Sequence, residues 1–336
     1  MRPAVEPRKF LIAAIHAVVS VAVLGWVASQ VGLADSVSAM AAIPLGTGVL
    51  AAAIVGVGFL ASTLRWQILL KNFAVAVPLW RLAVYYLIGL FVSLFLPTSA
   101  GGDAYRIYMV GRLSSKPVAA LFATLQERLI GLCGALAVSL AVMPVAGRAL
   151  PADILPWIAA VQIAALVALP FVLSPPLFLA VWAPLARRVG ALNAARWKSI
   201  RVIDRLSRML AGFGALMRTM PSNVLVLLLL ATIPALLVSI SYQIILSSIG
   251  VAAQIWVLML IIPIVWIVRF LPISLGGIGV GEGAFVLLAG FAGIDREKAF
   301  AAALAVLAIQ ILWALVGGAL LLRSGLKTAF DYARRG

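Results

Sequence analysis

The sequence predicts an all-α polytopic membrane protein, built as a helical bundle with two hairpins that are each broken by proline and glycine. Of its 336 residues, 65% are hydrophobic and only 11% are charged, whereas about 25% of the residues in soluble domains are charged. The apolar residues fall in runs of about 20, the length at which a helix crosses about 30 Å of hydrocarbon. The alternating ten-residue segments of a membrane β-barrel do not occur in the sequence. These observations exclude an ordinary soluble domain.

Nine apolar segments follow one another along the chain, and each is expected to form a membrane helix. They lie near residues 10–28, 43–64, 82–97, 118–142, 156–175, 223–246, 253–271, 280–294 and 299–322. The first follows Arg8 and Lys9, as in a signal peptide, but no convincing small-residue cleavage site comes after it. We expect one transmembrane domain over residues 1–336, with a first half at about 10–175 and a second at about 223–325.

The basic residues predict the orientation of the chain. The sequence has 26 Lys and Arg against 10 Asp and Glu, a formal net charge of +16. In a soluble protein this excess would suggest nucleic-acid binding, but in a membrane protein it marks cytoplasmic loops. Placing 20 of the 26 basic residues on one side leaves three on the other and puts both termini in the cytoplasm. We therefore expect membrane lipids as partners and no nucleic acid.

Several kinds of site are excluded by residue counts. Cys133 is the only cysteine and His16 is the only histidine, so sites that need several histidine and cysteine ligands are excluded within this chain. The phosphate-binding pattern G-x-x-x-x-G-K-[ST] does not occur, which gives no support for ATP hydrolysis by this chain. We expect neither a metal ion nor a cofactor.

Two breaks in the apolar pattern are related to each other. Residues 95–102 read F-L-P-T-S-A-G-G and residues 270–277 read F-L-P-I-S-L-G-G, identical at six of eight positions. The charge distribution requires residues 82–112 to leave and rejoin the cytoplasmic side, and residues 253–294 to do the same from the opposite side. We therefore predict an inverted repeat, whose breaks mark a substrate site in many transporters.

Proline removes a backbone donor and glycine permits non-helical dihedral angles, so such breaks expose backbone polar groups. Within the membrane these groups are tolerated only where protein or a wet cavity surrounds them. The candidate substrate-binding positions in the breaks are Pro97, Gly101, Gly102, Pro272, Gly276 and Gly277.

Charged residues near the breaks are further candidates for substrate binding: Asp103, Arg106, Glu127, Arg128, Arg269 and Glu282. A charge at the centre of a membrane helix costs about 2.5–3.5 kcal/mol on insertion scales, so we expect these six to line one polar interior cavity. Neighbouring helical residues point about 100° apart. Glu127 and Arg128 should therefore pair with other groups more than with each other.

Structural interpretations compete with these functional ones. The six charges balance three against three, so they could form a salt-bridge network without substrate. Asp103 could cap a half-helix while Arg106 anchors it at the cytoplasmic side. Arg269 could extend to the membrane interface at the end of a span. Arg65, beside Trp66, is most simply interpreted as an interfacial anchor.

The long loop at about 184–222 is basic and amphipathic. Within residues 196–217, apolar side chains form one stripe, and Lys198, Arg201, Arg205 and Arg208 lie opposite. This pattern is typical of a helix that lies on an anionic membrane surface, although a loop helix packed on the protein would show it too.

Motifs in both halves resemble those of a known family. They are Leu96-Pro97 with Gly101-Gly102-Asp103 and Arg106, Glu127-Arg128 with Gly131-Leu132, and Leu271–Gly279 with Glu282-Gly283. In these motifs, and in its span arrangement, the chain is similar to the lysylphosphatidylglycerol synthase transmembrane region, also called the flippase-like domain family.

The resemblance implies an integral protein of the bacterial cytoplasmic (inner) membrane that moves lipids or lipid-linked groups between leaflets. In fused family members a soluble aminoacyl-transferase domain follows the membrane region. This chain ends at Gly336, soon after its last apolar segment, so synthase activity is not expected. We expect a translocator of an anionic phospholipid or lipid-linked group, and not an enzyme. An enzyme acting on a lipid-linked substrate and a non-transporting envelope assembly factor are the alternatives.

Overall fold

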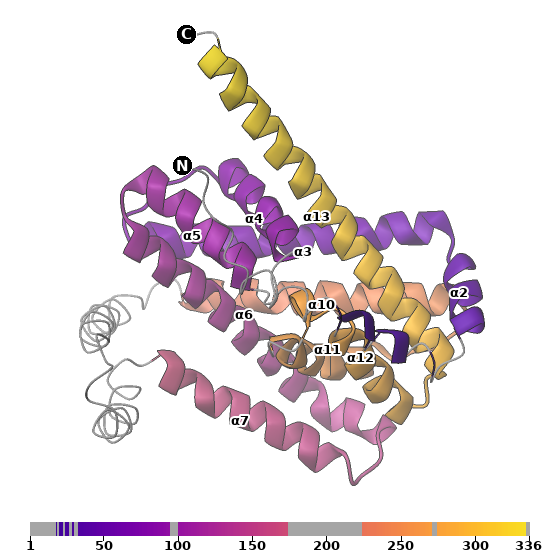
Figure 1. The fold of residues 1–336 in the computed structure, drawn as a ribbon. Helices are drawn as coiled ribbons and strands as arrows, with labels where there is room; N and C mark the ends of the chain where they lie inside the picture. The colour runs from indigo at the N-terminus through magenta and orange to yellow at the C-terminus, as the bar shows by residue number, and fades with distance from the viewer. Residues whose placement is uncertain are drawn as a thin grey trace, which may run out of the picture.

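A computed structural model describes residues 33–94, 100–173, 224–270 and 274–333, with a few positions between 18 and 29. In these ranges every regular element is helical, which confirms the predicted class (Figure 1). The first half contains α2 (Leu33–Ala41), α3 (Leu45–Asn72), α4 (Leu79–Ser93), α5 (Ala100–Ser114), α6 (Pro117–Ala146), η1 (Gly147–Ala149) and α7 (Leu155–Leu173). The second half contains α10 (Val224–Ser248), α11 (Ile255–Phe270), η3 (Leu275–Gly277), α12 (Val280–Phe291) and α13 (Arg296–Ala333).

Four helices in the described ranges are long and apolar enough to cross a membrane. They are α3, α6 with η1, most of α10, and the part of α13 from Arg296 to Arg323. All four correspond to expected segments, and α3 continues beyond the expected end of its segment at residue 64, to Asn72. The chain is therefore a multi-pass membrane protein.

The helices beside the two breaks are shorter. Helices α4 and α5 each have 15 residues, α11 has 16 and α12 has 12. At a rise of 1.5 Å per residue these helices are about 18–24 Å long, which is less than the hydrocarbon thickness. Because α4 packs on α5 and α11 packs on α12, each pair forms a broken hairpin. The segments expected at 82–97, 253–271 and 280–294 are the arms of these hairpins.

Glycine allows the first hairpin to close tightly. A Cβ atom on Gly102 would overlap the carbonyl oxygen of Gly89 on the facing helix. The Gly102 N–H also donates a hydrogen bond to the Ser93 hydroxyl at 3.0 Å. In the second break, Gly276 and Gly277 have φ angles of +57° and +79°, which glycine adopts at little cost.

The same order of helices occurs twice: long, short, break, short, long. Helices α3 to α6 have this order, and so do α10 to α13. The packing between the halves is also reciprocal, because α3 packs along α10, α4 packs on α13, and α11 packs on α6. The largest buried apolar cluster joins α3 to helices α10–α13. The two halves are therefore interleaved around a shared core (Figure 1).

Some predictions lie outside the described residues. The segment at 10–28 is largely outside them, as are the basic amphipathic segment at 184–222 and the break positions Pro97 and Pro272. Those predictions remain untested.

Candidate functional site

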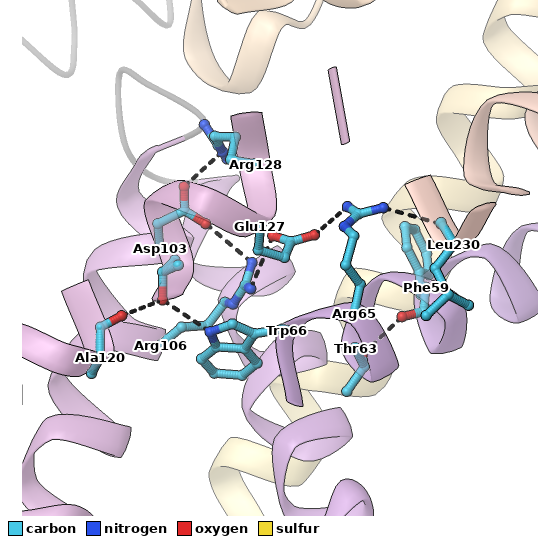
Figure 2. Close-up of polar contacts among 11 residues, drawn as sticks. Phe59, Thr63, Arg65, Trp66, Asp103, Arg106, Ala120, Glu127, Arg128 and Leu230 are labelled. Atoms are coloured by element: carbon cyan, nitrogen blue, oxygen red, sulfur yellow. Dashed lines mark hydrogen bonds and ion pairs between the residues drawn. The ribbon is translucent and has the colours of Figure 1, made fainter. Parts of the chain in front are cut away.

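Five charged side chains form a continuous chain of ion pairs among α3, α5 and α6 (Figure 2). Glu127 lies at its centre and contacts Arg65 Nη2 through Oε1 at 2.5 Å and Arg106 Nη2 through Oε2 at 3.2 Å. Arg106 Nη1 then contacts Asp103 Oδ1 at 3.2 Å. Asp103 Oδ2 contacts Arg128 Nε at 2.8 Å. Positive and negative groups alternate along this ion-pair chain, and both of its ends are arginines.

Burial differs along the ion-pair chain. The side chains of Arg65, Arg106 and Glu127 are only 4%, 6% and 5% exposed, and Asp103 is 12% exposed. Arg128 is 27% exposed. Since Arg65, Arg106 and Glu127 are almost completely buried, each depends on its neighbours to offset the loss of hydration. Arg128 is the member of the chain most open to a ligand.

Aromatic rings hold Arg106 in place. Its guanidinium carbon lies 4.2 Å from the ring centroid of Trp66 and 4.6 Å from that of Tyr86, distances that favour cation–π attraction. The Trp66 indole N–H donates to the Thr124 hydroxyl at 3.1 Å, and that hydroxyl donates to the carbonyl oxygen of Ala120 at 2.8 Å. These contacts hold the Arg106 guanidinium beside the carboxylates of Asp103 and Glu127.

A second charged group joins α11, α12 and α13. Arg269 on α11 forms an ion pair with Glu282 on α12 and donates to the Gln310 side-chain oxygen on α13 at 2.8 Å. Glu282 is fully buried, and its second oxygen accepts a 2.6 Å hydrogen bond from the Gly279 N–H. A Cβ on Gly281 would overlap the Arg269 side chain. The absence of a side chain at Gly281 therefore allows the Arg269 side chain to cross the start of α12.

A cavity of about 320 Å³ lies between the two halves. Its charged lining consists of Arg65, Arg106, Glu127, Arg128 and Arg269, from α3, α5, α6 and α11. Gln310 and Gly276 also line it, and much of the remaining wall is apolar, including Leu90, Leu132 and Val238. The cavity thus combines polar groups from both halves with apolar surface, as ligand sites commonly do.

The structure brings most of the predicted charged residues to this cavity. Four of the six line it directly. Asp103 and Glu282 are not part of the lining, but each forms ion pairs with arginines that are. As predicted, Glu127 and Arg128 pair with other residues.

Among the break positions, Gly276 lines the cavity, Gly277 packs against Arg269, and Gly101 and Gly102 are buried at the start of α5.

The interpretation of Arg65 as an interfacial anchor is wrong. The residue is 3% exposed, and its Nη1 donates to the carbonyl oxygen of Leu230 at 3.2 Å in addition to the Glu127 ion pair. The apolar pattern continues after it through Ile68 to Leu70, and this continuation was the available signal that Arg65 is not at a helix end. The predicted balance of three positive and three negative groups also changes. With Arg65 included, four arginines form ion pairs with three carboxylates among the described residues.

The chain is similar to a known protein family and to a named membrane protein. Residues 13–318 match the family described as Lysylphosphatidylglycerol synthase TM region. A protein of Methanothermobacter thermautotrophicus named "UPF0104 membrane protein" is 26% identical over 255 residues, which cover 71% of this chain and 74% of that protein. The family match spans both broken hairpins and every charged residue of the cavity.

Proposed function

Because the chain belongs to the family of the lysylphosphatidylglycerol synthase transmembrane region, we propose that it is a flippase-like translocator of an anionic phospholipid or lipid-linked group. The observation that carries this proposal is the cavity between the two halves, where four arginines meet three carboxylates. Arginine guanidinium groups bind phosphate through paired hydrogen bonds, which a compact ammonium group does not match.

The size of the cavity supports entry of a headgroup while the acyl chains stay outside. Pockets of about 300–1,000 Å³ hold drug-sized molecules, and a volume of about 320 Å³ is at the lower end of this range. A polar headgroup fits such a space. The acyl chains gain nothing by leaving hydrocarbon for a charged cavity, since burial of apolar surface already stabilises them in the bilayer.

An inverted repeat would give the cavity access from both leaflets. The repeated sequence break, the repeated helix order and the reciprocal packing of the halves all support it. In Figure 1, α3 begins beside α2 and α10 begins at the opposite end of the molecule, so these corresponding helices run in opposite directions. Rocking of two such halves around a shared site is the usual route to alternating access. We place the protein in the bacterial inner membrane with both termini cytoplasmic.

This function requires no covalent chemistry, and we propose that the protein is not an enzyme. The three carboxylates are held by arginines, which suits charge compensation better than proton abstraction from a substrate. Movement would follow the gradient of the lipid or of an ion, or depend on a partner.

Translocation in vesicles tests the proposal. The purified full-length protein is reconstituted with phosphatidylglycerol that carries a fluorescent acyl chain, and a membrane-impermeant quencher reports the fraction in the outer leaflet. We expect the protein to accelerate exchange between leaflets above the rate in protein-free vesicles. A rate equal to that of protein-free vesicles, with correctly folded protein, would favour the assembly-factor alternative.

A cavity-filling variant tests whether the cavity is the route. Val238→Trp adds an indole to the lining of the cavity on α10, and we expect its translocation rate to fall to the protein-free level. Leu287→Trp on α12 is the matched control, because Leu287 is 58% exposed on the apolar surface. Equal rates in the two variants would mean that lipid takes another path.

A further inference from the structure

We infer that the side of the cavity formed by the second half recognises a headgroup that carries hydroxyl groups, and that Gln310 distinguishes a hydroxyl from an ammonium group. The inference deepens the proposed function and rests on it, since it concerns the ligand of the same cavity. It follows from the orientation of one side-chain amide and from the kinds of polar side chains around it.

The orientation of the Gln310 amide is set by its neighbour Arg269. Arg269 Nη1 donates to Gln310 at 2.8 Å, and because a guanidinium group has no acceptor, the amide atom in this contact must be the oxygen. The Gln310 amide nitrogen, which carries two N–H donors, makes no hydrogen bond within the described ranges of the chain. Since Gln310 lines the cavity, these donors are available to a ligand there.

Arg269 is itself held firmly in the position that fixes this amide. Its ion-pair partner Glu282 is fully buried, and the second Glu282 oxygen accepts a 2.6 Å hydrogen bond from the Gly279 N–H. The Arg269 side chain is 16% exposed and also lines the cavity. The Arg269–Glu282 pair therefore keeps the Gln310 oxygen engaged, and a headgroup meets the amide nitrogen.

The polar side chains on this side of the cavity are mainly donors. Among the described residues of the second half, the polar side chains in the lining are Trp266, Arg269 and Gln310. Indole and guanidinium groups only donate, and the Gln310 oxygen already accepts a hydrogen bond from Arg269. The other side chains that this half contributes to the lining are apolar: Ala231, Pro234, Val238 and Ala314. A ligand that binds here must therefore supply acceptors.

A hydroxyl group fits these donors and an ammonium group does not. A hydroxyl oxygen accepts hydrogen bonds as well as donating one, whereas an ammonium group has three donors and no acceptor. An ammonium group would also place a second positive charge beside Arg269 and would leave the Gln310 donors unpaired and removed from water. Sites that hydrogen-bond a substrate hydroxyl reject analogues without it for this reason.

The chemical class that fits is a phosphodiester of a polyol, such as glycerol or a sugar. The same polyol phosphodiester occurs in a lipid headgroup and in a water-soluble glycerophosphodiester. The apolar part of the lining, which includes Leu90 and Leu132, favours the lipid, and the experiment compares the two directly.

The test measures equilibrium binding to the full-length protein in phosphatidylcholine nanodiscs at pH 7. Phosphatidylglycerol with a fluorescent acyl chain is displaced by unlabelled phosphatidylglycerol, phosphatidylethanol, phosphatidylethanolamine or soluble glycerophosphoglycerol. Phosphatidylethanol has the negative charge of phosphatidylglycerol but no headgroup hydroxyl, so this pair isolates the hydroxyl contribution. Wild-type protein should bind phosphatidylglycerol about tenfold more tightly than phosphatidylethanol, a difference of about 1.4 kcal/mol, and should bind phosphatidylethanolamine most weakly.

Two variants of Gln310 separate the amide from the shape of the side chain. Gln310→Met removes the amide and keeps an unbranched side chain, so it should bind phosphatidylglycerol and phosphatidylethanol equally. Gln310→Glu replaces the amide donors by a carboxylate oxygen that can accept from an ammonium group while the other oxygen stays with Arg269. This variant should shift the preference toward phosphatidylethanolamine.

Gln67→Met is the matched control, because it makes the same chemical change outside the cavity lining. The Gln67 side chain donates to the carbonyl oxygen of Val77 at 2.9 Å, and the variant should keep the wild-type preference. Elution as a single species in detergent verifies folding of each variant.

Two results would overturn the inference: equal wild-type affinity for phosphatidylglycerol and phosphatidylethanol, or an unchanged preference in Gln310→Met. Displacement by soluble glycerophosphoglycerol as strong as by the lipid would support recognition of the hydroxyl groups but assign the site to a water-soluble ligand. Selective lipid binding without translocation in vesicles would support the site and contradict only the proposed function.

Discussion

Replacing Glu127 by glutamine should destabilise the protein more than neutralising any other member of the ion-pair chain. Glu127 is the shared partner of Arg65 and Arg106, whose side chains are only 4% and 6% exposed. Breaking a buried ion pair by removing one partner costs about 3–5 kcal/mol, because the other charge stays buried and unpaired. We expect a comparable loss in the free energy of unfolding of Glu127→Gln, visible as a lower thermal unfolding midpoint in detergent.

A surface carboxylate provides the control for this loss. Asp295 is 69% exposed and lies 3.8 Å from Lys298, so Asp295→Asn should leave the midpoint nearly unchanged. The double variant Arg65→Gln/Glu127→Gln removes one charge of each sign and leaves Arg106 with Asp103. It should be more stable than Glu127→Gln alone. If Glu127→Gln unfolded at the same temperature as Asp295→Asn, the ion-pair chain would not be the buried structural unit described above.

Gly317→Ala should produce the second largest loss of stability. A Cβ atom at this position would overlap the carbonyl oxygen of Leu87 on α4, and a backbone atom cannot turn aside as a side chain does. Overpacking of this kind costs about 1–3 kcal/mol. The residue lies where α13 of the second half packs on α4 of the first, so the substitution should also slow translocation by separating the walls of the cavity.

Gly290→Ala on α12 is the matched control, since no atom lies within 4 Å of the Cβ that it would add. Alanine is the better helix former by about 1 kcal/mol, so this variant should be as stable as the wild type or more stable. Equal unfolding midpoints for Gly317→Ala and Gly290→Ala would contradict the close approach of α4 and α13.

The sequence predicts the long helices and the breaks because each depends on local features. Apolar runs such as residues 118–142 predict a span by length alone, and α6 contains that run. The two breaks follow from repeated proline and glycine, and Asp103 lies in the first turn of α5 as the start of a half-helix would require. Spacing along a helix also predicts that Asp103 meets Arg106, three residues later.

Partners far apart in sequence are not predictable in this way. Arg65 and Glu127 are 62 residues apart and meet only because α3 packs on α6. Gln310 is 41 residues from Arg269 and reaches it because α13 packs on α12, which in turn packs on α11. Without these long-range contacts, the sequence does not reveal that Arg65 belongs to the ion-pair chain, because it lies far from both breaks.

The most direct test of lipid entry into the cavity uses photo-crosslinking with two phosphatidylglycerol probes. One carries a diazirine on the headgroup and the other carries it at the end of an acyl chain, and mass spectrometry of the full-length protein locates each adduct. The headgroup probe should label cavity residues from both halves, such as Leu90 on α4 and Val238 on α10. The acyl probe should label exposed apolar positions such as Leu287 and Leu312. Acyl-chain adducts inside the cavity, with headgroup adducts confined to the outer surface, would contradict passage of a lipid headgroup through this site.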